Sequence, residues 1–363
     1  MVRNEDKSNY NMTVNLILQQ INKCLFDYIS KKNEIKRLKS LGIYNGEFGL
    51  LLYMALYNKY FPEPKFKNDM DLFVEYLLEE WSENPDCYTY CSGTSGILDM
   101  LSYLNENDIY HIDLCDVQDY LENYIANRMI KDINEGQYDF LHGALGPANY
   151  LLNKNTKLDY VEKFIHLLKK CSIKDGKIYK WLFFDPVSNK KVYNIALSHG
   201  MSSIVIFLSD AYRHDICRNE VSELLLGCSR FILNQKFDII SENRSMFPPM
   251  SKEDDITSSR LGWCYGDLGI AVALWEMGES MNLKEYKNWA ICIVENTMGR
   301  TDLNANMIRD AGICHGTAGV AMMFQYCREK MNLDKALILR DYWLSETIKM
   351  IPLNNQRLII SDW

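Results

Sequence analysis

The chain has 363 residues, of which 47% are apolar and 24% are charged, so it can bury a sizeable core and is not intrinsically disordered. Its 40 lysines and arginines against 48 aspartates and glutamates give a net charge of -8, which argues against a nucleic-acid-binding protein. The longest apolar run, residues 48–57, is too short for a transmembrane helix, and the polar first twelve residues do not resemble a signal peptide. Eleven cysteines without an export signal indicate reduced thiols, so we expect a cytoplasmic protein.

A short pattern recurs along the whole chain: small or aromatic residues, then G-x-x-G, then an apolar run. In chain order the six copies are YNGEFGLLLY (44–53), YCSGTSGILDML (90–101), YDFLHGALGPANYLL (138–152), LSHGMSSIVIFL (197–208), WCYGDLGIAVALW (263–275) and CHGTAGVAMMF (314–324). Their leading glycines are Gly46, Gly93, Gly143, Gly200, Gly266 and Gly316. The regular spacing of these glycines indicates one structural unit used repeatedly.

Between the glycine motifs, apolar residues recur every three or four positions, as on one face of a helix. The clearest examples are residues 14–28, 161–168 and 221–232. Each unit is therefore predicted to be an outer amphipathic helix, a loop, and a glycine turn that opens a more apolar inner helix. We expect an all-α single domain over residues 1–363, with a polar excursion at 241–260. Repeated helical hairpins can form an open solenoid or a closed ring, and periodicity alone favours neither.

The glycine turns also carry the residues best suited to bind a metal. His142, His199 and His315 directly precede a leading glycine, and Cys91, Cys264 and Cys314 stand two residues before one. If equivalent turns gather at one end of the fold, these side chains converge. Two thiolates and one imidazole, from Cys264, Cys314 and His315, would suit zinc and leave one coordination position open, as catalytic zinc sites do. The alternative is that the cysteines are ordinary small buried residues.

Taken together, the segments YDFLHGALG, ALSHGMSS, SRLGWCYGDLGIA and ICHGTAG resemble the lanthionine synthetase C family, the cyclases of lantibiotic biosynthesis. The similarity extends from the first glycine turn to Gly319. It implies a double α/α barrel, a toroid in which inner helices are ringed by outer helices and the glycine turns cluster at one end. It also implies that zinc is bound by Cys264, Cys314 and His315.

The resemblance further implies four residues that act beside the metal. His199 and Asp139 match the family's proposed acid/base histidine and aspartate. Arg260 and Tyr265 match the arginine and tyrosine that line the same site. His142 matches no catalytic position and is predicted to be a turn residue near the site.

Plainer roles for these residues stay open on the sequence alone. His199 could cap its turn through a backbone hydrogen bond, and Asp139 could be the N-cap of an inner helix. Arg260 could form a surface ion pair with Asp254 or Asp255.

The family reaction is the Michael addition of a cysteine thiol to dehydroalanine or dehydrobutyrine, which closes a (methyl)lanthionine thioether ring in a modified peptide. Zinc would take the substrate sulfur in its open position and lower the pKa of that thiol. Arg260 and Tyr265 would stabilise the enolate, and His199 would protonate it. Asp139 would hold the imidazole or help to remove the thiol proton.

The implied partners are a dehydrated precursor peptide and a lantibiotic dehydratase and exporter, in a complex that would bring this cytoplasmic enzyme to the membrane. Two other functions stay open. One is the addition of glutathione or another small thiol to dehydrated residues. The other is a peptide-binding scaffold without chemistry, which the complete set of ligands and acid/base residues argues against.

The chain departs from the family pattern in two places. Ser203 stands where the fourth repeat would have its second glycine, and we expect a local shift of the turn that leaves His199 in place. Family members usually have a seventh repeat, whereas this sequence ends in LIISDW, 44 residues after Gly319. A missing seventh hairpin predicts a folded, zinc-loaded chain that is open or dimerises. Apolar runs at 50–52 and 321–324 would be uncovered, with fast amide exchange near both termini.

Overall fold

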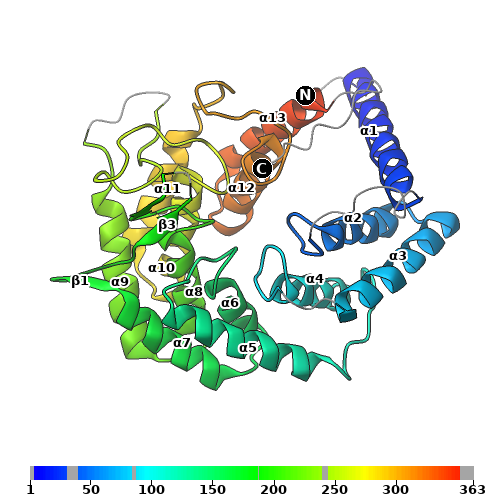
Figure 1. The fold of residues 1–363 in the computed structure, drawn as a ribbon. Coiled ribbons are helices and arrows are strands. Elements are labelled where there is room, and N and C mark those ends of the chain that lie inside the picture. Colours follow the sequence, from blue (N-terminus) through cyan, green and yellow to red (C-terminus); the bar gives the residue numbers. More distant parts are fainter. Residues whose placement is uncertain (1–3, 31–39, 84–86, 187, 239–243, 352–363) are drawn as a thin grey trace. The chain divides into compact units, whose positions relative to one another are not determined.

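The computed structural model describes residues 4–30, 40–83, 87–186, 188–238 and 244–351 and consists mainly of helices (Figure 1). In chain order the helices are α1 (Asn4–Ser30), α2 (Glu47–Tyr60), α3 (Pro64–Glu83), α4 (Thr94–Glu106), α5 (Gln118–Asn134), α6 (Leu145–Asn153), α7 (Leu158–Cys171), α8 (Met201–Arg213), α9 (Arg218–Asn234), α10 (Asp267–Ser280), α11 (Lys284–Thr297), α12 (Thr317–Lys330) and α13 (Asp334–Met350). The prediction of an all-α fold is confirmed. None of the described helices is long and apolar enough to span a bilayer.

Two short antiparallel hairpins between α7 and α8 were not predicted. β1 (Ile173–Asp175) pairs with β2 (Ile178–Lys180), and β3 (Phe183–Asp185) pairs with β4 (Lys190–Val192). The β1–β2 hairpin packs on α9 at Gly227, where a Cβ atom would lie 2.5 Å from the ring of Tyr179. Three-residue strands are too short to show an alternating pattern in the sequence.

The described chain divides into two compact units. The small unit comprises the described parts of Tyr28–Ser172 and His214–Arg218, and the large unit comprises those of Met1–Asp27, Ile173–Arg213 and Asn219–Trp363. Within the small unit α4 packs against α2 and α6, and within the large unit α10 packs against α8 and α11. The prediction of a single domain over residues 1–363 stays a prediction, since each unit is described by itself.

Each of the six glycine motifs opens a helix, as predicted: α2, α4, α6, α8, α10 and α12 all begin within two residues of a leading glycine. For three of the six glycine-headed helices the pairing differs from the prediction, which put the outer helix first, whereas α6 packs on both the preceding α5 and the following α7. The main partner of α2, α10 and α12 is instead the helix that follows, respectively α3, α11 and α13. Each of these pairs is joined by only three residues, and a short connection makes consecutive helices antiparallel neighbours.

The glycines permit a close approach of backbone to backbone at the turns. A Cβ atom on Gly319 would lie 1.7 Å from the carbonyl oxygen of Ile313, and Gly266 has a φ of +103°, which other residues rarely adopt. In the fourth repeat Ser203 replaces the second glycine. Its Oγ donates a hydrogen bond to the carbonyl of Gly200 at 2.7 Å, and α8 still begins directly after that glycine.

The predicted polar excursion at 241–260 is wrong in part, because the described residues 244–260 include buried apolar side chains. Met246 and Phe247 are almost fully buried, and their backbone N–H groups donate to the carboxylate of Asp267 in α10. A buried carboxylate needs such donors, which explains why this loop is drawn into the core.

Only some of the residues that the expectations about the end of the chain concern are described by the structure. The segment LIISDW lies outside the described residues. Within the runs 50–52 and 321–324, Leu51, Ala321 and Phe324 are buried, whereas Met322 is 57% exposed. The open or dimeric state expected from a missing hairpin stays a prediction.

Candidate metal centre

Main-chain hydrogen bonds join neighbouring glycine turns at one equivalent position, two residues before the leading glycine. In the large unit the N–H of Ser198 donates to the carbonyl of Cys264, and the N–H of Cys264 donates to the carbonyl of Cys314, both at 3.1 Å. The equivalent bonds of the small unit run from Tyr44 to Cys91 and from Cys91 to Leu141, at 3.2 and 2.9 Å. Within each unit the turns therefore lie side by side, as the family resemblance implied.

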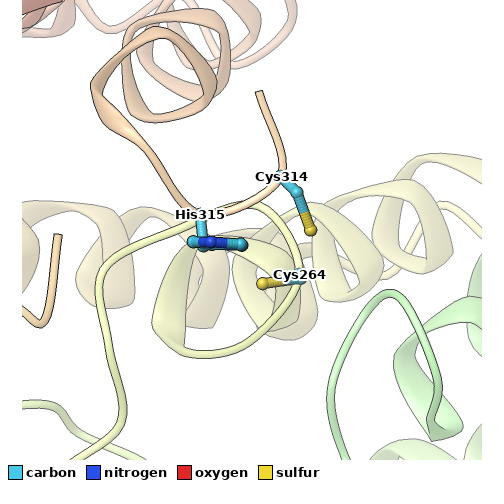
Figure 2. A group of neighbouring side chains, drawn as sticks. All are labelled: Cys264, Cys314 and His315. Atoms are coloured by element: carbon cyan, nitrogen blue, oxygen red, sulfur yellow. The ribbon is translucent and has the colours of Figure 1, made fainter. Parts of the chain in front are cut away.

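In the large unit this arrangement brings two thiols and an imidazole together. One donor atom from each of Cys264, Cys314 and His315 lies within 4.8 Å of the other two, and Figure 2 shows the sulfurs and the ring converging. Ligands of one tetrahedral zinc ion are separated by about 3.5–3.8 Å, given bond lengths near 2.3 Å to sulfur and 2.0 Å to nitrogen. The donor set and its spacing therefore fit a metal ion after small side-chain adjustments.

The two thiols differ in their acidity. The pKa of Cys264 is lowered, foremost by a hydrogen bond from Cys314 and also by His315 and the positive charge of Arg260, against the effect of burial. The pKa of Cys314 is raised, foremost by the same hydrogen bond and by burial. The hydrogen bond between the two sulfurs therefore favours loss of the first proton from the Cys264–Cys314 pair, and an ionised thiol is the form that binds metal.

The imidazole of His315 contacts a carboxylate that the sequence reading missed. Its Nε2 lies 3.2 Å from Oδ2 of Asp310, and both side chains are largely buried. The other carboxylate oxygen, Oδ1, accepts a hydrogen bond from the N–H of Gly312 at 2.7 Å.

His199 and Tyr265 occupy the position directly before the leading glycine in their turns, as His315 does in its own. Their ring centroids lie 6.3 Å apart. Asn194, also missed, is 4% exposed and donates from Nδ2 to the hydroxyl oxygen of Tyr265 at 3.3 Å. The large unit therefore brings His199 and Tyr265 together next to the loop that carries Cys264.

Arg260 is partly exposed and lies close enough to Cys264 and Cys314 for its positive charge to act on both thiols. For Cys314 this charge opposes the stronger effects that raise the pKa. The alternative of a surface ion pair finds no support among the described residues. Asp254 instead accepts hydrogen bonds from the Tyr193 N–H and the Ser251 hydroxyl, and Asp255 accepts one from the Thr257 N–H.

Asp139 and His142 lie in the small unit. Oδ1 of Asp139 accepts a hydrogen bond from the N–H of His142 at 2.8 Å, and the Asp139 carbonyl accepts one from Gly143 at 3.1 Å. Asp139 therefore closes the turn before α6 but is not the N-cap, which is Ala144. Its acid/base role stays a prediction, since the two units are described separately. His142 is a turn residue, as predicted, and is exposed. Its nearness to the site stays a prediction.

A buried ion pair supports the loop that carries Arg260 and Cys264. Arg300 donates from Nη1 to Asp267 at 3.1 Å, from Nη2 to the carbonyl of Ser259 at 2.8 Å and from Nε to Asn306 at 2.8 Å. The Arg300 and Asp267 side chains are 1% and 0% exposed. No sequence motif signalled this pair, because its partners are 33 residues apart.

Comparisons with known proteins identify the family and the fold. The family model described as "Lanthionine synthetase C-like protein" matches residues 3–125 and 40–349. The nisin biosynthesis protein NisC of Lactococcus lactis subsp. lactis is 22% identical over 362 residues, covering 91% of this chain and 83% of that protein. The solved structure of a nisin cyclase has a TM-score of 0.75 at 18% identity, covering 92% of this chain and 88% of the other, and so shows a shared fold.

Proposed function

The chain belongs to the lanthionine synthetase C-like family, and we propose that it is a zinc-dependent cyclase. Its substrate would be a dehydrated precursor peptide, whose cysteine thiols it adds to dehydroalanine or dehydrobutyrine to form (methyl)lanthionine rings. The observation that carries this proposal is the convergence of Cys264, Cys314 and His315 from two neighbouring turns. Arg260 and Tyr265 lie on the loop of Cys264, and His199 lies on the turn next to it.

In this proposal Cys264, Cys314 and His315 hold the metal. Zinc, when bound, supplies a lower pKa for the substrate thiol, so that the nucleophilic thiolate is available at neutral pH. Three protein ligands leave one coordination position for that sulfur. The low pKa of Cys264 supports metal binding near neutral pH, because one ligand is already ionised there.

The addition forms a C–S bond at the β-carbon of the dehydro residue and moves an electron pair onto its carbonyl oxygen. Arg260 and Tyr265 stabilise that negative charge with a guanidinium and a phenol hydrogen bond. His199 then delivers a proton to the α-carbon. The proton lost from the thiol balances the proton gained, so nothing leaves the substrate. Asp139 orients the imidazole or accepts the thiol proton.

The location and partners of the protein follow from the same proposal. A cyclase of this kind acts in the cytoplasm, after a dehydratase and before an exporter. In this proposal the protein forms a complex with the dehydratase and the exporter.

The test uses a synthetic peptide with one dehydrobutyrine and one cysteine, incubated with the purified full chain. Ring formation leaves the peptide mass unchanged but abolishes alkylation of its thiol, whereas glutathione addition raises the mass by that of glutathione. We expect about one zinc per chain and loss of the alkylatable thiol. The Cys264→Ala variant should lose both properties, and Cys292→Ala, which removes an exposed thiol of the same unit, should lose neither. A zinc-free wild-type protein, or glutathione addition without ring formation, would refute the proposal.

A further inference from the structure

In three of the six repeats, the side chain that stands six positions before the leading glycine accepts a hydrogen bond from the N–H two residues further on and so closes the turn. Asp310 accepts the N–H of Gly312 through Oδ1 at 2.7 Å, and Asn194 accepts the N–H of Ala196 through Oδ1 at 2.8 Å. In the small unit the hydroxyl of Ser40 accepts the N–H of Gly42 at 3.0 Å. A carboxylate, an amide and a hydroxyl all make this bond, so the turn itself does not require the negative charge of Asp310.

The second oxygen of Asp310 has a different partner. Oδ2 lies 3.2 Å from Nε2 of His315. Asp310 is also fixed through its backbone, because its carbonyl accepts the N–H of Thr317 at 3.1 Å. The carboxylate is therefore held on both sides and directed at the imidazole from within the same turn.

We propose that Asp310 is a positioning residue that fixes the ring orientation and tautomer of His315 for metal binding, an inference that rests on the zinc site of the proposed function. An ionised carboxylate can only accept hydrogen bonds, so the nitrogen that faces it carries the proton. Nε2–H donates to Asp310, and Nδ1 is the nitrogen presented to the metal. A carboxylate behind a metal-binding histidine also raises the basicity of the ring, and loss of such a partner lowers metal affinity about 10- to 100-fold.

The substitution Asp310→Asn separates the two roles of this residue. Asn194 shows that an amide closes the equivalent turn, so the fold should be retained. With Oδ1 still bound to Gly312, the amide places Nδ2 opposite Nε2 and disfavours the required tautomer. We expect zinc affinity, measured by competition with a chromogenic chelator, to fall about 10- to 100-fold. The cobalt-substituted protein should show altered visible absorption bands.

Two control experiments distinguish the proposed role of Asp310 from a general effect of the substitution on the fold. Asp302→Asn changes another turn aspartate of the large unit, which accepts the N–H of Ala305 at 2.7 Å, and should leave zinc affinity within about threefold of wild type. In a His315→Cys background the imidazole is gone. There, Asp310→Asn should leave zinc affinity unchanged or increase it, since a carboxylate disfavours a neighbouring thiolate.

The outcomes distinguish this inference from the proposed function. If wild-type protein binds zinc tightly and Asp310→Asn binds it equally well, the positioning role is wrong and the cyclase proposal stands. An equal loss in the His315 and Cys backgrounds would also overturn the positioning role, because the effect would then belong to the turn. A wild-type protein without zinc affinity would overturn both.

Discussion

The buried ion pair between Arg300 and Asp267 allows a quantitative test of what holds the metal-site loops. The perturbation is Arg300→Met, which keeps a long side chain but removes the guanidinium. Three hydrogen bonds are lost, to Asp267, to the carbonyl of Ser259 and to Asn306. The carboxylate of Asp267 keeps two backbone donors, but its charge is left without a counter-ion in a fully buried position.

Removing one partner of a buried ion pair costs about 3–5 kcal/mol, because the remaining charge is uncompensated. An exposed pair of the same unit provides the control. Arg328 lies 3.2 Å from Asp334, and their side chains are 35% and 88% exposed. Replacing Arg328 by Met should therefore cost less than about 1 kcal/mol.

Urea unfolding followed by tryptophan fluorescence measures the free energy of unfolding of the wild type and both variants. The double variant Asp267→Asn/Arg300→Met should recover much of the loss, since it leaves no buried charge. Zinc affinity should fall with Arg300→Met, because Ser259 adjoins Arg260 and Asp267 follows Cys264 by three residues. A loss below about 1 kcal/mol for Arg300→Met, equal to that of Arg328→Met, would refute the reasoning.

Four further outcomes are expected. The His199→Asn variant should retain zinc by elemental analysis, yet form rings about 10²- to 10⁴-fold more slowly, because proton transfer is lost; loss of the metal would make His199 a ligand. The Asn194→Asp variant keeps a side-chain oxygen that accepts the hydrogen bond of the turn, but the amide that donates to the Tyr265 hydroxyl becomes a carboxylate, which can only accept. We therefore expect kcat in the thiol-alkylation assay to fall, while the zinc content is unchanged. Removal of zinc by a chelator should stop ring formation, and added zinc should restore it. Burial raises the pKa of Asp267 from 3.8 to about 6, so its contribution to stability is fully present below pH 3.8 and lost as the pH rises through 6; relative to Asp267→Asn, the wild type should gain about 2 kcal/mol in urea unfolding between pH 6 and pH 4.

The sequence predicted the glycine-headed helices because a local signal, the G-x-x-G motif, marks where each one begins. It also predicted which cysteines and histidine would meet. Cys264 and Cys314 occupy the same position in consecutive turns, so any packing of equivalent turns brings them together. The wrong order of the helices in the pairs α2–α3, α10–α11 and α12–α13 arose because apolar periodicity identifies a helix but not its partner. The length of the connection does indicate the partner, because only three residues separate α10 from α11.

The residues that support the site, Asp310 and Asn194, could not be found from the sequence. Each acts through two atoms of its side chain, and only one of these atoms makes a local contact. Asp310 and Asn194 resemble ordinary turn residues, and their turn bonds are indeed local. Their second contacts, to His315 and Tyr265, depend on where the neighbouring side chains lie. The Arg300–Asp267 pair is harder still, since it joins the start of α10 to a loop after α11 through burial alone.

The candidate site can be understood as three positions of one turn, repeated three times in the large unit. These positions lie six, two and one residues before the leading glycine. In that order they hold Asn194, Ser198 and His199 in the fourth repeat, Arg260, Cys264 and Tyr265 in the fifth, and Asp310, Cys314 and His315 in the sixth. The main-chain bonds that join the turns involve only backbone atoms and recur in the small unit, where Cys91 is the only equivalent residue with a thiol two positions before a leading glycine. The backbone thus places side chains side by side whatever they are. The residue types at these three positions then determine which turns can bind a metal.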